Sequence, residues 1–214
     1  MYRSELRSKM QKVTTVTNTQ TRLEESRRLT QLEAKRRQDL IMSAEDRVAI
    51  TRTLSGETLL YTIKEIGMSD AADLLALASR EQVRHIVDLD CWRKDHFDDK
   101  RLLDWLRTLQ EGGEGKLTEW SLHADIEILV LLIQRHVEVI RQADIEDDIN
   151  FDHSKYFTLD DQYLLRFYGE PIPILRSLIE HIRNVDYRMY LHLLENSLFE
   201  LGSGLEEEAL RWRT

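Results

Sequence analysis

TLLYTIKEIGMSDAADLLALASREQVRHIVDLD, residues 58–90, decides the fold. Its first part has apolar residues at the i, i+1, i+4 and i+7 spacing of a helix face and ends at Gly67, a residue type common at helix C-caps. A second helical run covers residues 69–78, and Ser79 with Gln82 has the capping-box spacing that opens a third helix. The expected buried stripe of that third helix is Val83, Ile86, Val87 and Leu89. Because helices this short are unstable alone, the stretch predicts three short helices stacked against neighbours.

Helical patterns continue on both sides of this stretch. On the N-terminal side, residues 22–42 have a helical period, and Ser43 with Asp46 resembles a capping box for another short helix. On the C-terminal side, an amphipathic helix over residues 102–109 is expected to end at Gly112 and Gly113, followed by a short element over 117–122. Residues 124–140 are apolar on nearly all sides, which predicts one long core helix.

The last third of the chain begins with an acidic segment. Residues 144–161 carry seven acids and one Lys, which predicts a surface loop between two subregions, with Thr158 and Asp161 restarting a helix. Helices are then expected over 174–182, introduced by Pro171 and Pro173, and over 186–201. A final helix, capped by Ser203 with Glu206, reaches Trp212 and stops abruptly, so we expect the native protein to continue beyond residue 214.

These patterns together predict an all-α fold of short helical hairpins stacked into a superhelical, solenoid-like array. Leu-Leu pairs at 74/75, 102/103 and 131/132 are 28 and 29 residues apart, a period typical of helical repeats, although such pairs are also common in unrelated helices. The predicted domains are a disordered basic arm over 1–21, a helical-repeat domain over 22–143, and a second helical subregion over 155–214 that is truncated at its C-terminal end.

Composition excludes several classes of protein. Among 214 residues, 8 Gly and 2 Pro are too few for the many turns of a β-sandwich. A single Cys excludes a disulfide scaffold and suits a reducing cytoplasm. No apolar stretch is long enough for a secretory signal or a transmembrane helix, so we expect a cytoplasmic protein.

Charge is unevenly distributed along the chain. Residues 1–40 carry ten basic and five acidic side chains, a net charge of +5, so residues 41–214 carry −14. The basic arm could bind phosphate, a membrane surface or the acidic body itself, or be a solvated leader. The acidic body makes nucleic acid an improbable main partner, because neutralising phosphates requires a positive face.

Three segments carry a resemblance to a known family. The runs IKEIG at 63–67, LLALAS at 74–79 and DLDxW at 88–92 resemble an uncharacterised bacterial family, a domain of unknown function. LLDWLRTL, FTLDDQYLLRF and LEEEALRWR are similar to it too, so the resemblance covers roughly residues 40–213. It implies a protein longer than this chain and no known activity, cofactor or catalytic residue. The short helices are more distantly similar to the cytosolic N-terminal domain of bacterial magnesium transporters, which implies a superhelix of α-hairpins and only faintly a role in ion sensing.

Residues 88–99 hold the densest cluster of potential ligands. Its members are Asp88, Asp90, Cys91, Trp92, Asp95, His96, Asp98 and Asp99. Carboxylates at this spacing could hold a hard cation such as Mg²⁺, but the Gly and terminal Glu of an EF-hand loop and the paired Cys or His spacings of a zinc site are missing. A solvated loop with N-cap acids explains the same residues, so we assign no metal ligand and expect weak magnesium binding at most.

The sequence offers no strong catalytic pattern. Cys91 with His85 or His96 could be a nucleophile and a base, but no third orienting residue is identifiable and a structural thiol is the favoured interpretation. His123 and His136 are interpreted as cap or surface residues. Nucleotide-binding, hydrolase and metalloprotease motifs are missing, and Glu206, Glu207 and Glu208 fit the dipole of the last helix. We therefore assign no catalytic residue and no cofactor, and predict that the protein is not an enzyme.

Aromatic residues suggest binding instead. Core packing is expected for most of Trp105, Trp120, Tyr156, Phe157, Phe167 and Tyr168, but those lining a groove would be hot spots for a protein partner. The sequence thus predicts a cytoplasmic helical scaffold or protein-interaction module, whose partner is unidentified and whose acidic face selects basic partners. The alternative is a divalent-cation-responsive regulatory domain in which Asp88, Asp90 and Asp95 bind Mg²⁺.

Overall fold

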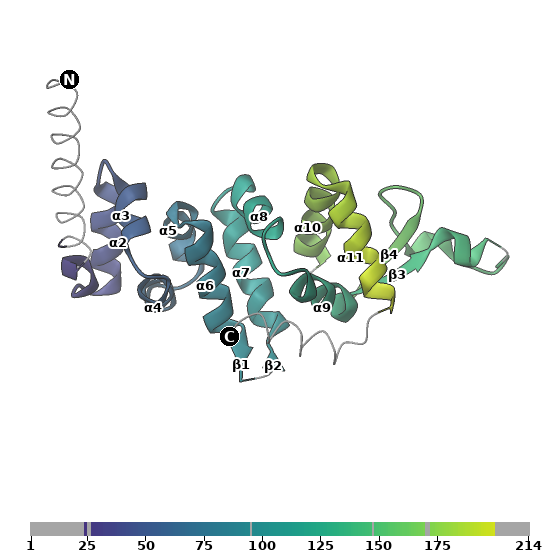
Figure 1. The fold of residues 1–214 in the computed structure, drawn as a ribbon, viewed down its shortest axis with the longest axis horizontal. Coiled ribbons are helices and arrows are strands. Elements are labelled where there is room, and N and C mark those ends of the chain that lie inside the picture. The colour runs from purple at the N-terminus through teal and green to yellow at the C-terminus, as the bar shows by residue number, and fades with distance from the viewer. Residues whose placement is uncertain (1–23, 25–26, 95, 147, 170–171, 200–214) are drawn as a thin grey trace, which may run out of the picture. The chain divides into compact units, whose positions relative to one another are not determined.

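A computed structural model describes residues 24, 27–94, 96–146, 148–169 and 172–199 (Figure 1). The described chain is mostly helical, as expected, but it also contains two short antiparallel sheets that the all-α prediction missed. It divides into two compact units, Met1–Ile86 and Val87–Thr214, and the division falls inside helix α6 (Arg80–Asp90). No helix among the described residues is both long enough and apolar enough to span a bilayer.

The first unit is a stack of short helices. Its elements are α2 (Ala34–Ser43), α3 (Arg47–Thr53), α4 (Gly56–Ile66), the 3₁₀ turn η1 (Ser69–Ala71), α5 (Ala72–Leu77) and the first part of α6. Helix α2 packs on α3 and α4, and α5 packs on α3 and α4. Ile41, Leu59, Ile63 and Leu74 are fully buried between them, which is the mutual burial that such short helices need.

The buried side chain of Arg37 binds backbone carbonyls of the segment that precedes α2. Arg37 donates from Nε to the carbonyl of Leu29 (2.8 Å) and from Nη2 to that of Leu32 (2.7 Å). These bonds close a turn at 31–33, so the single helix expected over 22–42 is wrong: a helical turn at 27–30 precedes α2. A buried guanidinium is tolerated here because several carbonyls accept its protons.

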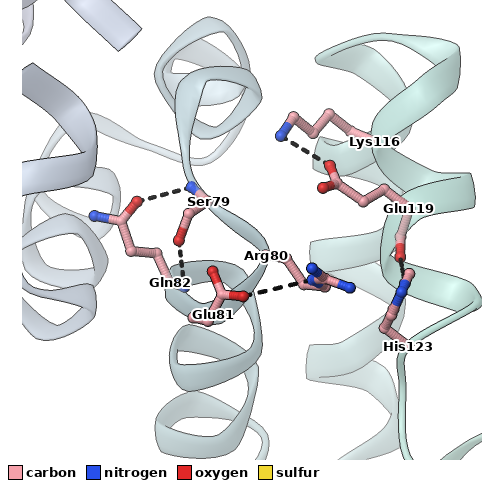
Figure 2. Close-up of polar contacts among 7 residues, drawn as sticks. All are labelled: Ser79, Arg80, Glu81, Gln82, Lys116, Glu119 and His123. Atoms are coloured by element: carbon pink, nitrogen blue, oxygen red, sulfur yellow. Dashed lines mark hydrogen bonds and ion pairs between the residues drawn. The ribbon is translucent and has the colours of Figure 1, made fainter. Parts of the chain in front are cut away.

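The predicted capping box of α6 is confirmed (Figure 2). The backbone N–H of Ser79 donates to Oε1 of Gln82 (2.8 Å), and the N–H of Gln82 donates to Oγ of Ser79 (3.2 Å). In addition, Nε2 of Gln82 donates to the carbonyls of Thr51 (2.9 Å) and Leu54 (2.6 Å) at the end of α3. Gln82 therefore hydrogen-bonds a backbone N–H at the start of α6 and two backbone carbonyls at the end of α3. Leu89, expected in the buried stripe of α6, is 44% exposed.

The capping box expected at Ser43 and Asp46 is wrong. Ser43 is the last residue of α2, and its hydroxyl donates back to the carbonyls of Asp39 (2.8 Å) and Leu40 (3.1 Å). Asp46 occupies the N-cap of α3 but accepts no side-chain hydrogen bond there. The hydroxyl of Ser43 therefore binds carbonyls in the last turn of α2, and not a backbone N–H at the start of α3.

The second unit combines helices with the two sheets. Its elements after α6 are β1 (Trp92–Arg93), β2 (His96–Phe97), α7 (Asp99–Glu111), α8 (Glu114–Ser121), α9 (Ile126–His136), β3 (Val137–Arg141), η2 (Gln142–Ile145), η3 (His153–Lys155), β4 (Tyr163–Phe167), α10 (Ile172–Val185) and α11 (Tyr187–Phe199). Helix α10 packs on α7, α8 and α11, and α11 packs on α9 and β3. Trp105, Leu106, Leu132, Leu165 and Leu178 lie in the resulting core.

The long helix expected over 124–140 is wrong. Helix α9 ends at His136, and the next five residues form β3, which pairs antiparallel with β4 in a register that sets Val139 opposite Leu165. The helix expected to restart at Thr158 and Asp161 is a turn instead, because Asp161 adopts φ 58° and its N–H donates to Oγ1 of Thr158 (2.9 Å). Pairing with a strand distant in sequence overrides the helical pattern here.

The acidic segment at 144–161 lies within the second compact unit. Helix α10 packs on α7 and α8, and α11 packs on α9, so these helices of the second unit share a core. The domain boundaries expected from the sequence, 22–143 and 155–214, stay a prediction. The arm at 1–21 and the capping box at Ser203 and Glu206 lie outside the described residues.

Candidate functional site

The acids of segment 88–99 bind protein groups. Oδ2 of Asp90 accepts from the indole N–H of Trp105 (2.9 Å) and lies 3.7 Å from Nε of Arg101. Asp98 caps α7, since its Oδ1 accepts from the backbone N–H of Arg101 (3.1 Å). Asp98 also pairs loosely with Arg93 (3.8 Å). The interpretation of this loop as one containing N-cap acids is confirmed for Asp98.

Asp99 joins the start of α7 to the end of α9. Its Oδ1 accepts from Nη1 of Arg135 (2.8 Å), and its Oδ2 lies 2.7 Å from Nε2 of His136. Nη1 of Arg135 also donates to the carbonyl of Phe97 (3.0 Å). Burial acts to raise the pKa of Asp99, but the hydrogen bond from His136 and the charge of Arg135 together hold that pKa below its ordinary value. His136 is therefore half-buried and paired, not the cap or surface residue expected.

The described residues contain no group of three or more His, Cys, Asp or Glu side chains placed to hold a metal ion. Asp95 lies outside the described part of the chain, and Asp88 has an interaction partner of its own. The magnesium site suggested by Asp88, Asp90 and Asp95 therefore remains a prediction without a ligand set assembled in the described residues.

Cys91 lies in the interior of the second unit. Its side chain is fully buried, and that burial, followed by the charges of Asp90 and Asp98, raises the pKa of the thiol above its ordinary value. A thiol that stays protonated at neutral pH is a poor nucleophile. His85 is exposed on α6, and Nδ1 of His123 lies 2.9 Å from the carbonyl oxygen of Glu119, a contact typical of a helix end. Figure 2 shows His123 beside the last turn of α8.

The six aromatic candidates separate into core and surface. Trp105 and Trp120 are buried, which is the expected packing role. Tyr156, Phe157 and Tyr168 gather around the β3–β4 sheet, where Phe157 pairs with Leu165 on the outer edge of β4. Phe167 is half-buried opposite Val137, so it lies on the other face of the sheet from Tyr168.

Two of these aromatic side chains and two charged neighbours form what we call the outer face: Tyr156, Tyr168, Glu138 and Arg166. Oε2 of Glu138 accepts from the hydroxyls of Tyr168 (2.7 Å) and Tyr156 (3.1 Å) and forms an ion pair with Nη2 of Arg166 (2.6 Å). The guanidinium of Arg166 lies over the rings of Tyr168 (5.0 Å) and Tyr156 (5.4 Å). The register sets Glu138 directly opposite Arg166, so the sheet itself positions the pair.

One carboxylate oxygen of Glu138 accepts two hydroxyl hydrogen bonds and pairs with Arg166. The hydroxyl of Tyr168, the hydroxyl of Tyr156 and the charge of Arg166 together lower its pKa from the ordinary value, with partial burial opposing them. A carboxylate held ionised by two hydroxyl donors and an arginine charge is a weak base and a weak nucleophile. The outer face is thus a preordered, partly exposed aromatic and charged surface, with Tyr168 44% exposed, and it has the chemistry of recognition.

The opposite face of the sheet carries a second polar group. Nη2 of Arg141 donates to Oε2 of Glu195 on α11 (2.7 Å), and the hydroxyl of Tyr163 donates to Oε1 of the same carboxylate. Burial and that bond to Glu195 raise the pKa of Tyr163 to about 12. Arg141 lies opposite Tyr163 in the register, which brings both to Glu195.

Sequence reasoning found the aromatic members of the outer face but missed its charged ones. Glu138 and Arg166 lie in segments expected to be helical, where they read as ordinary surface charges. The alternation of Val137, Glu138 and Val139 was the signal available for a strand with a polar outer side.

Comparisons with known proteins agree with the resemblance seen in the sequence. The model of a family described as "Family of unknown function (DUF6178)" matches residues 15–214. Searches of curated proteins and of solved structures gave no significant match. The likeness to the magnesium-transporter domain therefore stays a prediction. Since the family match covers most of the chain, the protein belongs to the DUF6178 family.

Proposed function

We propose that this protein is a non-enzymatic, cytoplasmic helical scaffold that binds a protein partner through the outer face. The observation that carries the proposal is the arrangement of Tyr156, Arg166 and Tyr168 around the carboxylate of Glu138 on the β3–β4 sheet. Tyr and Arg are enriched among residues that dominate the binding energy of protein interfaces. Side chains already ordered by one another lose less conformational entropy when a partner binds.

The sequence segment that carries the outer face indicates the charge of that partner. Between Glu138 and Gly169 the chain has eight acidic and three basic residues, although Arg166 lies at the centre of the cluster. Charge complementarity favours a partner with a basic surface and speeds its association at low ionic strength. The predicted preference for basic partners is thus supported by the net acidic charge of residues 138–169.

We also propose that pairs of short helices stack on one another as in a helical-repeat scaffold. Within the first unit, α2 packs on α3 and α4, and α5 packs on α3 and α4. Within the second unit, α7 packs on α8 and α10 on α11. Pairs of short helices that pack on their neighbours in chain order are the building blocks of helical-repeat scaffolds, which display rigid surfaces to partners.

A catalytic or cation-binding role has less support from the residues of segment 88–99. The thiol of Cys91 is buried, and Asp90, Asp98 and Asp99 bind protein donors. A cation that changed helix packing through these acids would have to displace those donors, so the divalent-cation alternative is the weaker proposal.

The test compares bait variants in crosslinking pull-downs from native lysate. Tyr168→Ala and Arg166→Ala remove outer-face side chains, and Tyr61→Ala is the matched control, because Tyr61 is 61% exposed on α4. Proteins that bind this surface should be retained by the wild type and by Tyr61→Ala, and lost by both outer-face variants. Equal retention by all four baits would contradict the proposal.

A further inference from the structure

An apolar hollow of about 150 Å³ lies beside α2 and α3 in the first unit. We call it the α2–α3 hollow, and its lining residues are Arg28, Leu29, Leu32, Leu40, Ile41 and Ile50. Leu40 is 45% exposed, so part of the apolar lining is open to solvent. A cavity of this size lined by Leu and Ile is large enough to hold a small apolar group.

Two arginines lie at this hollow. Arg28 lines it, and Arg36 lies one turn before Leu40 on α2, so Arg36 and Leu40 share a face of that helix. Both arginines are exposed, and neither guanidinium forms an ion pair or a hydrogen bond with a described residue. Over residues 27–40 the chain carries five basic and two acidic side chains. The hollow therefore fits an apolar side chain that is surrounded by acids.

The second unit presents such a side chain, Ile149. It is 97% exposed, the largest exposed fraction among the large hydrophobic side chains of the described residues. The N–H of Phe151 donates to the carbonyl of Asp148 (3.1 Å), which closes a turn with Ile149 and Asn150 at its centre. The ring of Phe151 packs on that of Tyr156, with 4.9 Å between the ring centroids. The turn is thus anchored, and it holds Ile149 out in solvent.

The chain around Ile149 is acidic. Residues 144–152 carry five acidic side chains and no basic one. Asp144, Glu146 and Asp148 are exposed, and none of the three forms an ion pair with a described residue. This segment is therefore complementary to the α2–α3 hollow in two respects, an apolar side chain for an apolar lining and negative charge for positive charge.

We propose that Ile149 of one copy of this chain inserts into the α2–α3 hollow of a second copy, with the acids around Ile149 facing Arg28 and Arg36. Burial of Ile149 and of the exposed part of Leu40 removes apolar surface from water, and the opposite charges orient the approach. The two surfaces differ, so the contact is heterologous and builds a ring or a head-to-tail chain of copies. The inference goes beyond the proposed function, because it concerns self-association and uses no residue of the outer face.

Sedimentation velocity of the purified full-length chain, over a hundredfold range of protein concentration at low ionic strength, is the test. The wild type should form larger species as its concentration rises. Ile149→Ser and Leu40→Asp should each weaken association about tenfold or more, the effect of leaving one isoleucine unburied. Val185→Ser and Leu89→Asp are the matched controls, because Val185 is 58% and Leu89 is 44% exposed, and both should associate like the wild type.

A mixing experiment separates the loss of docking from misfolding. Ile149→Ser keeps the hollow and Leu40→Asp keeps the isoleucine, so an equimolar mixture of the two should form a one-to-one complex that grows no further. A wild type that stays monomeric, an Ile149→Ser variant that associates like the wild type, or a mixture without a complex would overturn the inference. Tyr168→Ala should self-associate like the wild type, so a failure of the outer-face function leaves this contact standing.

Discussion

Replacing Gln82 tests how the first unit is held together. Gln82 is 7% exposed, and its side chain makes three hydrogen bonds: it donates to the carbonyls of Thr51 (2.9 Å) and Leu54 (2.6 Å), and it accepts from the N–H of Ser79 (2.8 Å). Gln82→Met keeps most of the volume and removes all three. At about 1 kcal/mol for each net hydrogen bond, the free energy of unfolding should fall by about 3 kcal/mol.

Two further variants calibrate that number. Ser79→Ala removes only the hydroxyl half of the capping box and should cost about 1 kcal/mol. Gln38→Met removes a single exposed bond, to the carbonyl of Asp70 (2.7 Å), and should cost less than about 0.5 kcal/mol. The expected order of destabilisation is therefore Gln82→Met, Ser79→Ala, Gln38→Met.

Urea unfolding followed by circular dichroism at 222 nm measures these differences. The midpoint should shift at constant slope, because the surface exposed on unfolding is unchanged. Hydrogen exchange should locate the loss of protection in α3 and the start of α6. If Gln82→Met costs no more than Gln38→Met, the carbonyls of Thr51 and Leu54 do not depend on Gln82, and the reasoning is refuted.

Four other outcomes are expected. Asp99→Asn should lower the free energy of unfolding at pH 7 by about 1–2 kcal/mol, since Arg135 and His136 lose a charged acceptor. Because the pKa of Asp99 is depressed in the fold, the wild type has this contribution above about pH 4 and loses it as pH falls further, so the two denaturation curves should converge in acid. Leu106→Ala, at a fully buried site, should cost about 2–5 kcal/mol by the same urea assay. Cys91 should react with a disulfide reagent at pH 8 only as fast as the protein opens, and at once in urea; fast reaction of the native state would contradict its burial. Millimolar Mg²⁺ should leave the melting temperature unchanged, whereas specific binding at a hundredfold excess over Kd would add about 2.7 kcal/mol.

Local chemistry determined the parts of the fold that the sequence predicted well. Gly67 ends α4 with φ 107°, a conformation that glycine adopts without steric cost. Ser79 and Gln82 form their capping box because both partners lie within one turn of the same helix. The family resemblance, too, was carried by short runs of sequence.

Long-range pairing determined what the sequence did not show. Residues 137–141 continue an apolar helix pattern, yet they form a strand, because β4 lies more than twenty residues further on and offers a complete antiparallel partner. The outer face follows from that register, which sets Glu138 opposite Arg166 and brings Tyr156 and Tyr168 to the same carboxylate. No spacing within one segment reports such a pairing.

Two neighbouring aspartates show the same difference between local and long-range contacts. From the sequence, Asp98 and Asp99 are adjacent acids with the same two interpretations, a cation site or a loop with N-cap acids. Asp98 has the N-cap role, which depends only on the backbone three residues ahead. Asp99 instead pairs with Arg135 and His136, more than thirty-five residues away. The sequence alone thus predicted the end of α4 at Gly67, the capping box of α6 and an N-cap acid for α7, which depend on neighbours in the chain. The tertiary structure alone decided which charges meet, because that depends on how the helices and the β3–β4 sheet pack.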